Sequence, residues 1–79
     1  MENRSLVFDL VDWIAKSPRA YSVVMEAWRT SCPRLSIWEE ATDRRFVERY
    51  VDEEGRPMVR ATDHGRHFLQ TETKRRAAA

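Results

Sequence analysis

The spacing of apolar residues changes near residue 46, and this change limits what the chain can fold into. Before it, apolar residues recur every three or four positions, which is the period of one face of a helix. After it, residues 46–51 are rich in β-branched and aromatic residues and partly alternate with polar ones, as strands do, and residues 58–61 are predicted to form a second strand after a turn. The sequence therefore predicts an α+β domain in which helices come first and a β-hairpin follows.

Three helices are expected before this change. The first begins near Leu6 with Ser5 as its cap, and it ends before Pro18 because the residue preceding a proline is disfavoured in helical geometry. The second spans residues 21–29 and the third spans residues 33–44. The inward face of the first helix is predicted to hold Leu6, Val7, Leu10, Val11 and Ile14.

Large aromatic side chains are expected to fill the core of so small a domain. A chain of 79 residues holds one domain, and a core of that size supplies roughly 3–5 kcal/mol of net stability. Trp28 and Trp38 fall on the inward faces of the second and third helices, and Leu35 and Ala41 share the face of Trp38. The opposite face of the third helix is then predicted to point toward a partner.

A turn and a short final helix complete the predicted domain. Residues 52–57 contain Gly55, which suits the positive φ of a hairpin turn. Thr62 is expected to cap the last helix. The predicted organisation is a short extension over residues 1–5, a folded domain over residues 6–70 and a flexible basic tail over residues 71–79.

Several residues near the hairpin carry a resemblance to a known family. Residues 46–49 read Phe-Val-Glu-Arg, and residues 62–69 place Thr62, Gly65, Arg66 and Leu69 in the pattern Thr-x-x-Gly-Arg-x-x-Leu. With the order helix-helix-helix-strand-strand-helix, this resembles the winged helix-turn-helix domain of MarR-like bacterial transcription regulators. The resemblance covers residues 6–70 and implies a winged-helix protein that binds duplex DNA in the bacterial cytoplasm.

The match to that family has one supporting detail and two departures. Within the matched segment, Gly65 would let the last helix lie close to the sheet, where a side chain would clash. The family usually has glycine before the first wing strand, where this chain has Arg45 and Phe46. The long helices that pair MarR-type subunits do not fit within 79 residues, so a homodimer, if formed, is expected to be weak.

The resemblance also implies which residues contact DNA. The third helix would enter the major groove, and the wing would contact the DNA backbone or the minor groove. Arg34 near the start of the third helix is expected to pair with guanine, and the hydroxyl of Ser36 with a base or phosphate. The predicted DNA-contacting residues are Arg34, Ser36, Ile37, Glu40, Arg44, Arg49, Arg56 and Arg60.

Charge supports two different partners. Arginine suits phosphate and guanine, and arginines greatly outnumber lysines here, although GC-rich codon usage explains such an excess equally well. The net charge is only +1, and carboxylates on the third helix and at the wing tip would repel phosphates. The alternative is therefore a protein–protein interaction module on the same scaffold. A continuous positive surface would favour DNA, and a mixed surface would favour a protein.

No catalytic, metal or cofactor site is predicted. Cys32, Asp63, His64 and His67 are too few to supply convergent ligands, so we expect surface histidines and a cysteine buried in a turn. A single cysteine forms no intramolecular disulfide, and no signal peptide or membrane-spanning segment is apparent. These features predict a reduced, cytoplasmic protein that is not an enzyme.

Overall fold

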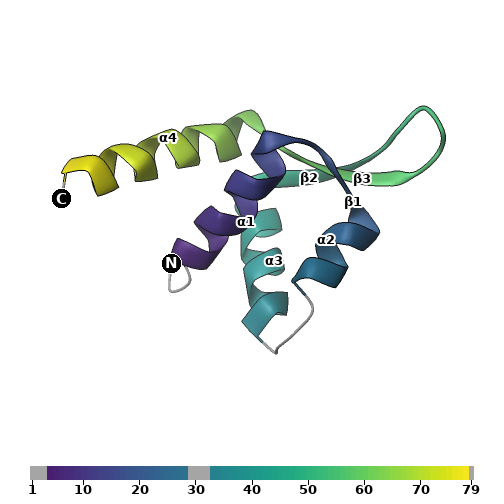
Figure 1. The fold of residues 1–79 in the computed structure, drawn as a ribbon, viewed down its shortest axis with the longest axis horizontal. Helices are drawn as coiled ribbons and strands as arrows, with labels where there is room; N and C mark the ends of the chain where they lie inside the picture. Colours follow the sequence, from purple (N-terminus) through teal and green to yellow (C-terminus); the bar gives the residue numbers. More distant parts are fainter. Residues whose placement is uncertain (1–3, 29–32, 79) are drawn as a thin grey trace.

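The chain folds in the order predicted from its sequence, with one additional strand (Figure 1). The computed structural model describes residues 4–28 and 33–78, without the side chains of residues 33–36 and 78. The elements are α1 (Arg4–Lys16), β1 (Arg19–Ala20), α2 (Tyr21–Ala27), α3 (Pro33–Asp43), β2 (Val47–Val51), β3 (Pro57–Ala61) and α4 (Asp63–Ala78). Over the described residues these form four helices and a three-stranded antiparallel sheet, which confirms the α+β class.

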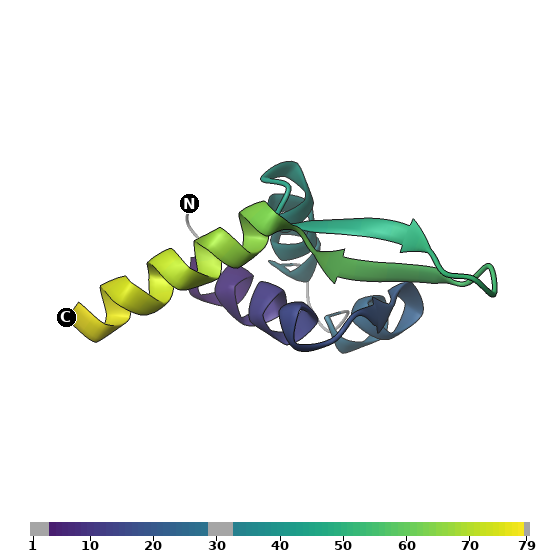
Figure 2. The ribbon, with the colours of Figure 1, turned by 90° about the horizontal axis from the view of Figure 1, so that it is seen from above.

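The sheet has the order β1-β3-β2. The hairpin of β2 and β3 is in register from Val47 opposite Ala61 to Val51 opposite Pro57. β1 adds only Arg19 and Ala20 to the other side of β3, and two residues are too few to show the alternation by which strands are predicted. The hairpin tip and the carboxyl end of α4 lie at opposite ends of the molecule (Figure 2).

The core is centred on α1, which contacts α3, α4 and β3. Four of the five residues predicted for its inward face are fully buried, whereas Leu6 is 42% exposed. The buried hydrophobic residues are Val7, Leu10, Val11, Ile14, Val24, Ile37, Ala41, Phe46, Val47, Val59 and Ala61. The centre of the core is therefore mainly aliphatic, with Trp13, Trp28 and Trp38 packed against it and only partly buried.

The inward face of α3 differs from the prediction. Ile37 is 1% exposed and lies one helical turn before the buried Ala41, so this pair faces α1. The larger indole of Trp38 lies at the border of the core, against the ring of Tyr21. Because its side chain is buried, Ile37 cannot contact a DNA groove, and its assignment to the DNA-contacting set was wrong. The side chain of Leu35 lies outside the described residues.

The first and last helices of the described chain are longer than predicted. α4 continues to Ala78, so residues 71–78, where a tail was predicted, are helical. Glu72 is buried, ion-pairs with Arg4 at 3.8 Å and accepts a hydrogen bond from Arg75 at 3.2 Å. α1 begins at Arg4, so Ser5 lies inside the helix and does not cap it. A contact between residues 68 positions apart in the sequence thus joins α1 to α4, and local composition does not reveal it.

A short backbone contact joins the start of α4 to the start of β2. The amide of Thr62 donates to the Phe46 carbonyl at 2.9 Å, and its hydroxyl donates to the Arg45 carbonyl. The same hydroxyl accepts from the Gly65 amide at 3.0 Å, which confirms Thr62 as a helix cap. A Cβ placed on Gly65 would lie 2.1 Å from the Phe46 oxygen. The predicted close approach at Gly65 is therefore confirmed.

The carboxyl end of α3 is closed by a residue in the left-handed conformation. Arg45 has a φ of 60°. The Phe46 amide donates to Ala41 at 2.9 Å and the Arg45 amide to Thr42 at 3.0 Å, the hydrogen-bond pattern of a Schellman motif. Glycine is the usual residue at this position because it has no Cβ to clash. Arg45 thus takes the conformation of the glycine expected before the first strand of the hairpin.

Substitution of Gly65 by alanine is expected to lower the free energy of unfolding by about 2–3 kcal/mol, since the obstructing atoms belong to backbone and cannot move aside. Thr71→Ala, at an exposed position of the same helix, serves as the control and should change stability little. Urea denaturation measures both variants. Equal stability of Gly65→Ala and the unaltered protein would contradict the close contact between α4 and Phe46.

The variant Arg45→Gly is expected to gain about 0.5–1 kcal/mol, because glycine relieves the left-handed backbone at this residue. Arg45→Ala removes the same charge but keeps the Cβ, so it should show no gain. Thermal and urea unfolding of the two variants separate backbone strain from charge. A gain of the same size in Arg45→Ala would point to charge instead.

Candidate functional site

The outer surface of α3 carries more negative than positive groups where its side chains are described. Glu39, Asp43 and Arg44 are exposed, and Glu40 is half-buried. The guanidinium of Arg44 donates to the Glu40 carboxylate one turn earlier. Both residues were predicted to contact DNA, and in this pair their charges cancel. Arg34 and Ser36 belong to the first turn of α3, but their side chains lie outside the described residues.

Two of the three predicted arginines of the hairpin are also paired with carboxylates. Arg56 lies 3.2 Å from Asp52 and 3.3 Å from Glu54, within the turn itself. Arg60 on β3 lies 3.0 Å from Glu48, its partner across the two strands. Each guanidinium has a local counter-ion, so neither offers its full charge to a phosphate.

Arg49 has a different environment. Its guanidinium carbon lies 4.1 Å from the centre of the Tyr21 ring at the start of α2. The Tyr21 ring in turn packs edge-on against Trp38 of α3, with 5.9 Å between the ring centres and an interplanar angle of 68°. This stack could not be predicted from the sequence, because its three residues belong to three separate elements.

The hairpin turn is held by the carboxylate of Asp52. One oxygen of this side chain accepts from the amides of Glu54 at 2.9 Å and Arg56 at 2.8 Å. Gly55 has a φ of 83°, which confirms the predicted positive φ in this turn. The hydrogen bond from the Arg56 amide is the main reason that the pKa of Asp52 lies below its usual 3.8. The negative charge of this carboxylate therefore helps to shape the turn.

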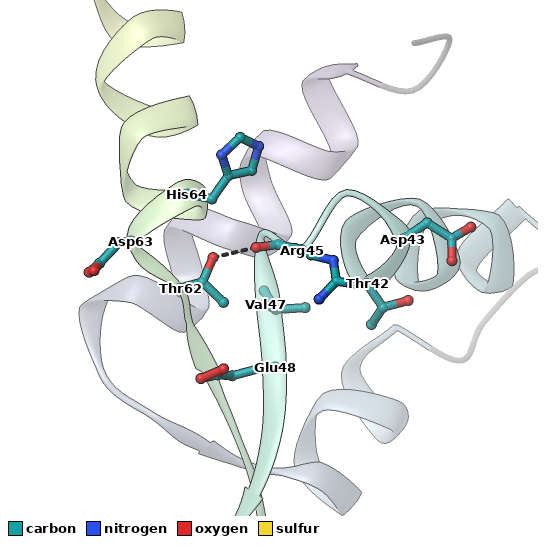
Figure 3. Close-up of a pocket in the computed structure, with 8 residues that line it drawn as sticks. All are labelled: Thr42, Asp43, Arg45, Val47, Glu48, Thr62, Asp63 and His64. Carbon is teal, nitrogen blue, oxygen red and sulfur yellow. Dashed lines mark hydrogen bonds between the residues drawn. The ribbon is translucent and has the colours of Figure 1, made fainter.

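A shallow depression of about 600 Å³ lies where the end of α3, the start of β2 and the start of α4 meet (Figure 3). The imidazole of His64 stacks on Phe46, with 5.3 Å between ring centres. Asp43 and Asp63 lie on opposite sides of Arg45, so the polar groups do not converge on one point (Figure 3). Its lining residues are Thr42, Asp43, Arg45, Val47, Glu48, Thr62, Asp63 and His64.

The described residues show no other concentrated site. Over residues 4–28 and 33–78, no group of three or more potential ligands is arranged to hold a metal ion. Cys32 lies outside this part of the chain. The exposed large hydrophobic residues in the same ranges are Leu6, Val23 and Val51, each on a different element. In the described helices, none is long and apolar enough to cross a membrane.

Known proteins do not identify this chain. No protein-family model, no curated protein and no solved structure matches it. Function must therefore be inferred from the arrangement of its own residues.

The carboxylate of Asp52 should titrate below pH 3.8 in the folded protein. Because the folded pKa is lowered, its contribution to the turn is present above the unfolded value and is lost as the pH falls through the folded one. Carboxyl NMR gives the titration, and hydrogen exchange of the Glu54 and Arg56 amides reports the turn. Asp52→Ala should accelerate this exchange, whereas Glu53→Ala should not. Unchanged exchange in Asp52→Ala would rule out this role.

Proposed function

We propose that this chain is a winged helix-turn-helix domain that binds duplex DNA. The observation that carries the proposal is the placement of α3, which buries Ile37 and Ala41 against α1 and leads directly into a projecting hairpin (Figure 1). The order α1-β1-α2-α3-β2-β3-α4, with β1 beside β3, also fits a winged helix. In such a domain, α3 is the helix that enters the major groove.

The first turn of α3 would make the main contact. Residues 29–36 contain Arg29 and Arg34 together with three hydroxyl side chains, and they contain no carboxylate. The second half of α3 carries Glu39 and Asp43 at exposed positions, which would repel phosphate. The amino end of α3 would therefore enter the groove, in keeping with the positive end of a helix dipole.

The wing would contribute modestly to affinity. Since Arg56 and Arg60 are paired with carboxylates, few cations remain to displace counter-ions from DNA. A dimer bound to two half-sites would raise the effective affinity of so small a footprint. Such a dimer, acting as a bacterial transcription regulator, is the form of this function that we propose.

A protein-docking role is the second candidate, and the charge of the surface favours it. Residues 37–61 contain five arginines and seven carboxylates, a formal charge of −2. This surface is mixed, as expected for a site that contacts protein. The exposed hydrophobic residues of the described chain are dispersed, however, and a protein interface usually has an apolar centre. For this reason DNA binding is placed first.

Fluorescence anisotropy with a mixed-sequence duplex tests the proposal. We expect a dissociation constant of about 10⁻⁶–10⁻⁴ M at physiological salt. A plot of the logarithm of affinity against the logarithm of salt concentration should have a slope of roughly −2 to −4, as a few phosphate contacts would give. Arg34→Ala should weaken binding about tenfold if it contacts a base. Arg44→Ala removes an arginine already paired with Glu40 and is the matched control.

The two candidate functions give different results in this assay. Absence of binding at low salt would exclude the DNA function and leave protein docking. Equal losses in Arg34→Ala and Arg44→Ala would show that binding depends on net charge and not on the first turn of α3.

A further inference from the structure

Arg49 is the one arginine of the two hairpin strands whose side chain lies on the same side of the sheet as the helices. Successive side chains of a strand point to opposite faces. Val47 is buried against the helices, so Arg49, two residues later, extends to the same side. Val59 and Ala61 are buried on that side of β3, which places Arg60 on the opposite face with Glu48. Of these two arginines, Arg49 alone faces the side that holds α2 and α3.

The charge of Arg49 is not neutralised. Among the described side chains of residues 37–61, Arg45 and Arg49 are the arginines without a carboxylate within 4.0 Å. A contact with an aromatic ring attracts a cation to the electron-rich face of the ring, but it brings no counter-charge. Arg49 is therefore held in place by Tyr21 while its full positive charge remains available to an anion.

The position of this guanidinium is defined by two further elements. Tyr21 begins α2, directly after the short strand β1. Its ring packs edge-on against Trp38, which anchors it to α3. An arginine whose side chain is already ordered loses less conformational entropy when it binds a ligand. The stack of Arg49, Tyr21 and Trp38 thus fixes a cation in relation to the helix that we propose enters the groove.

We propose that Arg49 binds a phosphodiester of the DNA backbone, with Tyr21 and Trp38 as positioning residues. This inference rests on the proposed function and specifies which part of the hairpin contacts the duplex. The contact would come from the middle of β2 and not from the acidic tip, where Asp52 and Glu54 surround Arg56.

The experiment compares Arg49→Ala with Arg60→Ala in salt-dependent duplex binding. Arg60 is the matched control, since it also lies over a tyrosine, with 4.5 Å to the ring of Tyr50, yet it pairs with Glu48. Arg49→Ala should weaken binding about tenfold and reduce the salt dependence by about one phosphate contact. Arg60→Ala removes the same formal charge and should change affinity less than about twofold.

Substitution of Tyr21 tests its positioning role. Tyr21→Leu leaves the arginine charge in place but removes the ring, so affinity should fall about threefold while the salt dependence stays the same. Tyr21→Phe keeps the stack and should bind as the unaltered protein does. Circular dichroism confirms that each variant is folded, and Arg49→Ala, at an exposed position, provides the decisive comparison if Tyr21→Leu unfolds.

The outcomes separate this inference from the function on which it rests. If the unaltered protein binds no duplex at low salt, both are overturned. If it binds and Arg49→Ala binds equally well, DNA binding stands and the role of Arg49 is overturned. Equal losses in Arg49→Ala and Arg60→Ala would also overturn it, because net charge alone would then explain the effect.

Discussion

The whole arrangement depends on one backbone contact, where Gly65 lies directly against the carbonyl of Phe46. This contact joins the only two places at which the chain passes between its helices and the β2–β3 hairpin, namely the end of α3 and the start of α4. The hydroxyl of Thr62 reinforces it by bonding both sides at once. The Phe46 ring then stacks on Phe68 with 4.3 Å between ring centres, so α4 is held by side chains as well. The direction of the hairpin relative to α3 follows from this junction.

Much of the framework could be predicted from the sequence because it depends on local rules. The spacing of Val7, Leu10, Val11 and Ile14 identified the buried face of α1, and Gly55 marked the turn. The register of α3 could not be obtained in this way, since Ile37 and Trp38 are both apolar neighbours. Packing against α1 decides which one enters the core, and in the folded chain Ile37 is buried whereas Trp38 is only partly buried.

Interactions between distant residues account for the remaining errors. The basic end of α4 resembles a disordered tail in composition, but the buried carboxylate of Glu72 pairs with Arg4, and Arg76 lies 4.0 Å from the ring of Phe8. In the same way, a list of arginines does not reveal their counter-ions. The pair of Arg60 and Glu48 exists because the hairpin register places them opposite each other. The sequence therefore identified the arginines of the candidate site, but it did not show which of them are paired with carboxylates.

Among its described side chains, the surface formed by α3 and the hairpin holds few arginines whose charge is free of a paired carboxylate. An arginine already paired with a carboxylate offers little net positive charge to a phosphate, so its net contribution to binding is small. Arg44, Arg56 and Arg60 are in this position, whereas the cation of Arg49 has only an aromatic support. In the DNA-binding function that we propose, such a surface would attract the duplex only weakly from a distance, because its carboxylates cancel the long-range field. Discrimination between sequences would then depend mainly on the first turn of α3, with a few fixed cations setting the orientation of the domain.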